Sequence, residues 1–318
     1  MIRYGEPIMR VYDDTCLDHM ASPARHIFPY ISRALNAVVP ERKDESGKMF
    51  PDFRLEYHDT HKWLARAIPP RRTIRLSRKA VEMAWVMTYG AIKLEPIRAN
   101  GLVNGCYDLD LATIPEAKPA CRLINWAFTT WLNCDDLPWP EELPQPQEGD
   151  LRDPAMTGVL QGSLGVLGFL LLHELGHIHY NHDPDSSGAE EEREADYWAV
   201  DFLFDRCPED GPTRFRRGTI CAIALGLIVA KDAHTSTVHC GRHPPSYDRL
   251  VHSLQRHFPD EADKVWMFAS GVLALHLSNS PLQNARRGDM TEYRTPLEIV
   301  QREADFLSQL PWSTTSRQ

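Results

Sequence analysis

The sequence predicts an α+β protein that is mostly helical, with a small mixed β-sheet drawn from its N-terminal part. Three observations predict this fold class. Apolar residues recur at helical spacing through much of the 318-residue chain, most strongly after residue 154. The segment RTIRLS, Arg72–Ser77, has the pattern of a short strand. Between these regions, Leu137–Pro154 combines prolines and acids without an apolar period, which indicates a loop or a linker.

The predicted helices lie on both sides of this loop. Before it, helical spacing covers His26–Val39, Arg78–Leu94 and Ala120–Leu132. After it, helical spacing covers Gly158–His182, Ala189–Asp205, Arg217–Lys231, Pro244–His257 and Glu261–Ser278. We therefore expect an N-terminal α/β part over 1–140 that contributes the sheet, and a helical core over 155–318. The same pattern also allows one continuous domain.

Composition excludes several classes of protein. The formal net charge of −9 argues against a general nucleic-acid-binding protein. The seven cysteines are scattered and form no C-x-x-C pair, which predicts a reducing, cytoplasmic environment. The N-terminus, MIRYGEPIMRVYDD, lacks the apolar core of a signal peptide. The apolar runs Val159–Leu172 and Thr219–Ala230 fall short of the roughly 20 residues that span a bilayer, so we expect buried core helices and no membrane insertion.

A basic segment overlaps the predicted strand. Lys62–Lys79 has the sequence KWLARAIPPRRTIRLSRK. A cluster of this kind is either a solvated face or a docking surface for an acidic protein partner.

The segment LLHELGHIHYNH, Leu171–His182, holds a metal-binding motif. His173, Glu174 and His177 form H-E-x-x-H. Residues four apart lie on the same face of a helix, so both imidazoles can bind one cation while Glu174 lies beside it. Two histidines and one oxygen ligand make a catalytic zinc site with water in the open position. Zinc lowers the pKa of that water to about 7, and Glu174 is the general base that takes its proton.

A second acidic helix offers the oxygen ligand. In AEEEREADYWAVDFLFD, Ala189–Asp205, Glu192 and Asp196 form E-x-x-x-D at helical spacing. We expect Glu192 to bind the metal, and Asp196, one turn further on, to accept the N–H of a ligand histidine. Glu191 and Glu194 are the alternatives for the third ligand.

Two further histidines follow the motif. His179 is two residues past His177, on the wrong side of the helix for the metal. His182 is nine residues past His173 and could reach only the edge of the site. Both are interpreted as the polar end of the helix.

At these residues the sequence resembles the gluzincin-type zinc metallopeptidases. The specific part is the pairing of HELGH with EREAD. In that group the two histidines and the first glutamate of E-x-x-x-D bind zinc, and the glutamate of H-E-x-x-H is the general base. The resemblance implies the same roles, in that order, for His173, His177, Glu192 and Glu174.

A later segment narrows the resemblance to one family. HCGRHPPSYDRL, His239–Leu250, places His-Pro-Pro before an arginine and a new helix. With the two motifs above it is similar to the Lit family of phage-exclusion peptidases, as is the upstream segment Ala67–Gly90. In the broader group a late histidine or tyrosine contacts the oxyanion of the tetrahedral intermediate. The resemblance gives this catalytic role to His243, with Tyr247 or Arg249 as alternatives; otherwise His243 only starts a helix.

The resemblance implies a zinc-dependent endopeptidase that cleaves a specific protein target, in phage exclusion or a stress response. The partner is then a protein or peptide substrate and the cofactor is Zn²⁺. In a zincin-like domain the sheet lies over the H-E-x-x-H helix, and an extended substrate adds to the sheet edge. The alternative is a non-proteolytic zinc-binding sensor or interaction domain on the same scaffold. A purely structural zinc site does not need Glu174, whose presence favours the peptidase.

Overall fold

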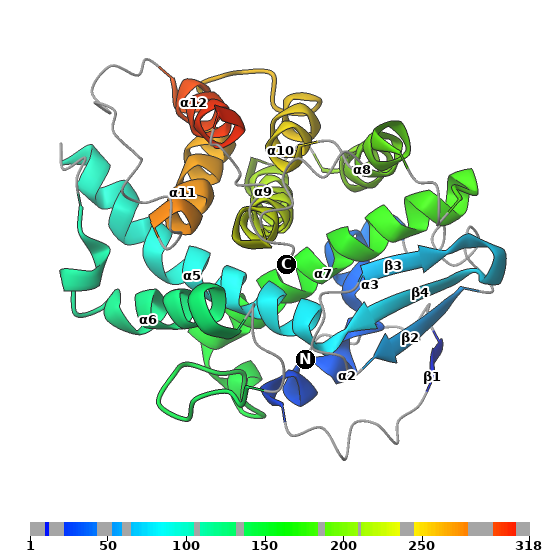
Figure 1. Ribbon diagram of the computed structural model, residues 1–318, viewed down its shortest axis with the longest axis horizontal. Helices are drawn as coiled ribbons and strands as arrows, with labels where there is room; N and C mark the ends of the chain where they lie inside the picture. Colours follow the sequence, from blue (N-terminus) through cyan, green and yellow to red (C-terminus); the bar gives the residue numbers. More distant parts are fainter. Residues whose placement is uncertain are drawn as a thin grey trace, which may run out of the picture.

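A small mixed sheet lies against a set of helices in the computed structural model (Figure 1). The structure describes residues 10–12, 22–42, 53–58, 65–104, 109–131, 137–183, 188–208, 211–235, 245–278 and 295–309. The strands are β1 (Arg10–Tyr12), β2 (Arg54–His58), β3 (Ala65–Ile68) and β4 (Thr73–Ser77). Their order is β1-β2-β4-β3, with β3 antiparallel to β4 and the other pairs parallel. The predicted fold class, mostly helical α+β with a small mixed sheet, is confirmed.

The helices fall on both sides of the acidic loop. Those before it are α2 (Phe28–Ile31), α3 (Ala34–Val38), α5 (Arg78–Val103) and α6 (Lys118–Trp126), with the short 3-10 segments η1 (Pro23–His26), η2 (Pro40–Arg42), η3 (Pro69–Arg71) and η4 (Leu111–Thr113) and a π turn, η5 (Ala127–Trp131). Those after it are η6 (Asp150–Arg152), α7 (Pro154–Tyr180), α8 (Ala189–Phe204), α9 (Gly211–Thr235), α10 (Ser246–Gln255), α11 (Lys264–Ser278) and α12 (Pro296–Gln309). One buried apolar cluster draws on both sides of the loop.

Helix α7 runs through the middle of the molecule (Figure 1). The side chain of Asp153 accepts the N–H of Ala155 at 2.9 Å, and Pro154 occupies the first turn, so the start of the helix is well capped. Asn181 ends the helix in a left-handed conformation. By length and composition α7 could cross a membrane, but 67% of its most apolar 18-residue window is buried. The core helix of a globular protein is buried in this way. Helices α3, α5, α8 and α9 all contact α7.

Helix α8 is fixed at its far end by two arginines. Arg42 donates to the carbonyl of Phe202 at 2.7 Å, and the buried Arg217 donates to the carbonyl of Leu203. These carbonyls belong to the last turn of the helix and have no partner within it. The two guanidinium groups therefore hold the end of α8 against η2, which carries Arg42, and α9, which carries Arg217.

The N-terminal elements differ from the sequence prediction. The single helix predicted over His26–Val39 is wrong, because the segment forms η1, α2 and α3 in succession. Pro29 lies in the first turn of α2, where its missing N–H costs nothing, but the same missing N–H disfavours a helix that continues through it from η1. Of the strands, only β4 was predicted individually; β1 and β3 have only three and four residues, too few to show an alternating pattern.

Candidate metal centre

The structure brings His173 and His177 of α7 next to Glu192 of α8. All three residues are buried, with 6%, 7% and 6% of their surface exposed. Close packing of the two helices makes this meeting possible. A Cβ atom on Gly176 would lie 3.0 Å from the Cα of Ala195, so a larger residue there would push α8 away from the histidines.

The three donor atoms have the spacing of a tetrahedral metal site. The Nε2 atoms of His173 and His177 are 3.1 Å apart. Oε2 of Glu192 lies 3.4 Å from Nε2 of His173, and the other carboxylate oxygen, Oε1, lies 3.6 Å from Nε2 of His177. Bonds of about 2.0–2.1 Å in a tetrahedron separate neighbouring ligand atoms by about 3.4 Å. The three side chains therefore fit one zinc-sized cation, with a fourth position left over.

Glu174 lies beside this group and is held by the sheet. Its Oε2 accepts the backbone N–H of Ala67 in β3 at 2.6 Å. Burial raises the pKa of the Glu174 carboxyl, and the charge of His173 opposes that rise. A carboxylate with a raised pKa, fixed next to a metal position, is suited to accept a proton from water.

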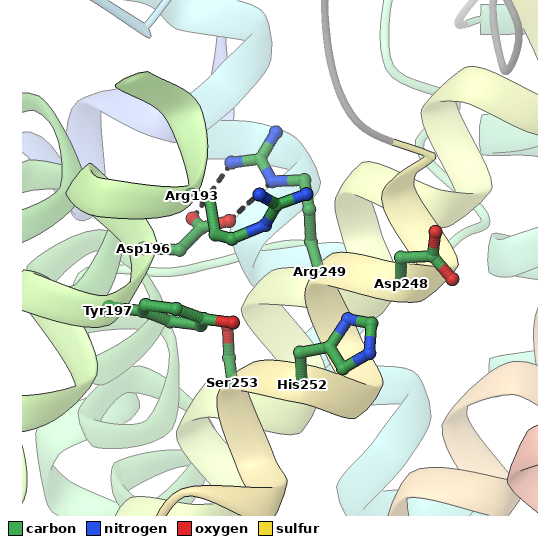
Figure 2. A pocket seen from close by; sticks show the side chains of 7 residues that line it. All are labelled: Arg193, Asp196, Tyr197, Asp248, Arg249, His252 and Ser253. Carbon is green, nitrogen blue, oxygen red and sulfur yellow. Dashed lines mark hydrogen bonds and ion pairs between the residues drawn. The ribbon is translucent and has the colours of Figure 1, made fainter. Parts of the chain in front are cut away.

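Asp196 and Arg249 lie on the Nδ1 side of His173, away from the metal position. Oδ1 of Asp196 lies 2.9 Å from Nδ1 of His173. Arg249 of α10 donates to both Asp196 oxygens, at 2.6 and 2.9 Å (Figure 2). It also lies 3.4 Å from Oε2 of Glu192. Asp196 is thus placed to orient His173, and Arg249 to orient Asp196 and Glu192.

The surroundings shift the pKa values of the two histidines in opposite directions. Burial opposes the charged form of His173, but the Asp196 and Glu192 carboxylates outweigh it and raise the pKa of His173 to about 10. Burial and the neighbouring charge of His173 lower the pKa of His177 to about 3. Burial alone would raise the pKa of Asp196, yet Arg249 and His173 together lower it. The two carboxylates therefore favour a proton on His173 when no cation is bound, and that proton must leave when a metal binds.

His182 takes a place that the sequence did not predict. Its Nδ1 lies 2.8 Å from Nδ1 of His177, and its Nε2 lies 3.2 Å from Oε2 of Glu194. The turn at Asn181 folds the chain back, and the His182 N–H donates to the carbonyl of His177 at 3.0 Å. When Nε2 of His177 binds a metal, its Nδ1–H can donate to His182, whose own N–H can donate to Glu194.

The other described candidates lie outside the group of His173, His177 and Glu192. Glu191 accepts the Gly188 N–H at the start of α8, and Glu194 contacts His182. His179 is exposed and stacks on Trp198, as expected for a polar helix end. His243 lies outside the described residues.

Asp196→Asn is expected to weaken metal affinity or activity by about 10- to 100-fold, without abolishing either. The amide keeps the shape of Asp196 but no longer supplies the charge that favours the His173 Nδ1–H. Zinc titration against a chromogenic chelator measures the change. Asp201→Asn is the matched control, because Asp201 lies on the same helix and pairs with Arg256 away from the metal position. An equal loss in both variants would show a general effect of changing α8.

Comparison with known proteins identifies the family. No curated protein and no solved structure matches the chain. The model of the family described as Peptidase U49 matches residues 74–269, more than half of the chain, and this span includes all of α7, α8 and α10. The predicted resemblance to a Lit-like peptidase is confirmed at this level. The chain belongs to the Peptidase U49 family.

Proposed function

We propose that this peptidase is a zinc-dependent endopeptidase of the gluzincin type. The observation that carries the proposal is the buried group of His173, His177 and Glu192, whose donor atoms all lie within 4.8 Å of one another. Two imidazoles and one carboxylate are the ligand set of catalytic zinc sites, which keep one position open. Membership of a peptidase family supports a protein or peptide as the substrate.

In this proposal, zinc and the side chains of the protein contribute different parts of peptide hydrolysis. Zinc, when bound, supplies a Lewis acid that polarises the scissile carbonyl and lowers the pKa of the attacking water. Glu174 accepts the proton of that water and passes it to the leaving amine. His182 and Asp196 hold the two ligand histidines in the tautomer that leaves Nε2 free for the metal.

Strand β3 is suited to align the substrate. It is an edge strand, and the Ala67 N–H that reaches Glu174 points away from β4. In a strand the backbone groups of alternate residues point to the same side, so those of Ala65 also face the open edge. An extended peptide paired with this edge would run past Glu174 and the metal position.

The biological role is proposed from the Lit resemblance. We take the target to be one specific cytoplasmic protein, cleaved in phage exclusion or a stress response. A search of the whole proteome for new protein N-termini, after induction of the wild-type chain or of Glu174→Gln, tests this. One or a few new N-termini that depend on Glu174 would support it. Identical sets from both chains would favour a non-proteolytic zinc protein.

Glu192→Gln is expected to weaken zinc binding more than either neighbouring substitution. Glu192 faces both histidines, whereas Glu191 caps the helix and Glu194 contacts His182. Glu191→Gln should leave the zinc content unchanged, and Glu194→Gln should give a smaller loss, through His182 and His177. Zinc per chain after dialysis against a weak chelator measures all three. A larger loss in Glu191→Gln or Glu194→Gln would assign the ligand to that residue.

A further inference from the structure

A group of arginines covers the outward side of the sheet and the turn between β3 and β4. Leu55, Ala67, Ile74 and Leu76 point inward and are buried. Of the residues that alternate with them, Arg54 and Arg66 are exposed and Glu56 and Arg75 are partly exposed, whereas Thr73 and Ser77 at the two ends of β4 are buried. We call five residues of this side and the turn the basic surface: Arg54, Arg66, Arg71, Arg72 and Arg75.

The basic surface has the opposite charge to the whole chain. Five arginines face one glutamate, Glu56, which Arg75 binds at 3.0 Å. Their formal sum is +4, whereas the chain as a whole carries −9. Glu56 is the one acidic residue in the described strands and in the turn that joins β3 to β4. The surface is thus a local positive region on an acidic protein, and it attracts acidic partners over the distance that salt allows.

Two of these arginines occupy places that stability does not favour. Arg66 lies directly opposite Arg75 in the antiparallel pair, where like charges destabilise a sheet. Arg72 has φ 49° and ψ 44°, a left-handed conformation that glycine or asparagine adopts more readily. Neither the cross-strand position of Arg66 nor the backbone conformation of Arg72 favours arginine, and both side chains are exposed.

The basic surface adjoins the edge that faces the metal centre. Arg66 directly precedes Ala67, whose N–H donates to Glu174. A strand added to β3 would place every second side chain on the same face as Arg66. Charged side chains on neighbouring strands attract when their signs are opposite. A substrate segment in this position would therefore meet arginines on its outward face while its backbone passes the catalytic carboxylate.

We infer that the basic surface docks an acidic segment of the protein substrate, next to the bond that is cut. The inference rests on the proposed function, because it names the class of substrate for the same site. Its occupant is an extended segment with Asp or Glu at alternating positions, which matches both the spacing of a strand and the sign of the surface. Exposed ion pairs each contribute a factor of about 1.5 to 5 in affinity, so several together give about tenfold.

Binding can be measured without cleavage. Zinc-loaded Glu174→Gln is titrated into two fluorescein-labelled peptides, (Glu-Thr)6 and (Gln-Thr)6, and anisotropy is read at low and at high salt. We expect (Glu-Thr)6 to bind about tenfold more tightly at low salt, with the difference lost at high salt. When Arg66→Gln and Arg72→Gln are added to the Glu174→Gln chain, the preference for (Glu-Thr)6 over (Gln-Thr)6 should disappear. Adding Arg216→Gln, at an exposed arginine of α9, is the matched control and should keep it. Equal binding of the two peptides, or an equal loss in the control, would overturn the inference.

Cleavage separates this inference from the proposed function. The wild type is incubated with a peptide library made from a whole proteome, and the new ends are sequenced. Enrichment of Asp and Glu near the cut, lost in the Arg66→Gln/Arg72→Gln variant and kept in Arg216→Gln, is the expected result. Cleavage without such enrichment would overturn the docking of acidic segments alone. No zinc-dependent cleavage at all would overturn the peptidase mechanism and this inference with it.

Discussion

Glu174→Gln is expected to leave the fold and the zinc content close to wild type while cleavage is almost abolished. Glutamine has nearly the same size as glutamate, and its side-chain oxygen can still accept the Ala67 N–H. It cannot accept the proton of the attacking water. General-base catalysis is typically worth about 10² to 10⁴ in rate, and Glu174 also carries the proton to the leaving amine, so the loss should lie at or above the upper value.

Three measurements decide this prediction: zinc per chain, the thermal unfolding temperature and the rate of cleavage of a target found from its new N-terminus. Glu190→Gln is the control, because Glu190 is exposed on α8 and pairs with Arg193 at 2.7 Å. It should cut at the wild-type rate. A Glu174→Gln chain that cuts at a near wild-type rate would rule out the proposed mechanism. A chain that binds zinc but unfolds at a much lower temperature would show a structural role for the contact with Ala67.

Local periodicity is enough to predict the ligand helices. The four-residue spacing of His173 and His177 needs only a helix, and α7 supplies it. Glu192 and Asp196 are also four residues apart, so on α8 they lie on one face. Glu192 faces the metal position and Asp196 faces His173. Neither spacing shows that the two helices touch. Contact depends on Gly176, which lets Ala195 approach, and the sequence alone does not show that this glycine is at the interface.

The sequence did not predict the roles of His182 and Arg249, because these roles depend on contacts formed only in the tertiary structure. His182 was interpreted as part of a polar helix end, yet it is buried against His177 because the left-handed Asn181 turns the chain back. The one available signal was an asparagine just past the helix, a common helix-ending residue. Arg249 was considered only for the oxyanion. Its contact with Asp196 joins residues 53 positions apart, a separation at which no periodic pattern applies.

His173→Ala and His177→Ala are each expected to lose most of the bound zinc. Only two protein ligands remain in either variant, and two rarely hold a site. Zinc per chain should therefore fall from about one equivalent to near zero in both. His179→Ala is the control, since His179 is exposed on the same helix and should keep the metal. Full zinc retention in both ligand variants would remove the metal centre from the proposal.

The metal-free forms of the two variants should differ in stability. The carboxylates of Glu192 and Asp196 raise the pKa of His173, whereas burial and the charge of His173 lower the pKa of His177, so we expect the positive charge of the metal-free pair on His173. Removing one partner of a buried ion pair costs about 3–5 kcal/mol. Arg249 still pairs with Asp196, so His173→Ala should fall near the lower end of that range.

His177→Ala removes no charge. It leaves the buried Nδ1 of His182 without its neighbour, a change of about 1–3 kcal/mol. Chemical denaturation of the chelator-treated proteins at neutral pH should therefore rank wild type above His177→Ala, and His177→Ala above His173→Ala. The reverse order would mean that His173 is neutral without metal, and that the carboxylates of α8 rely on Arg249 alone.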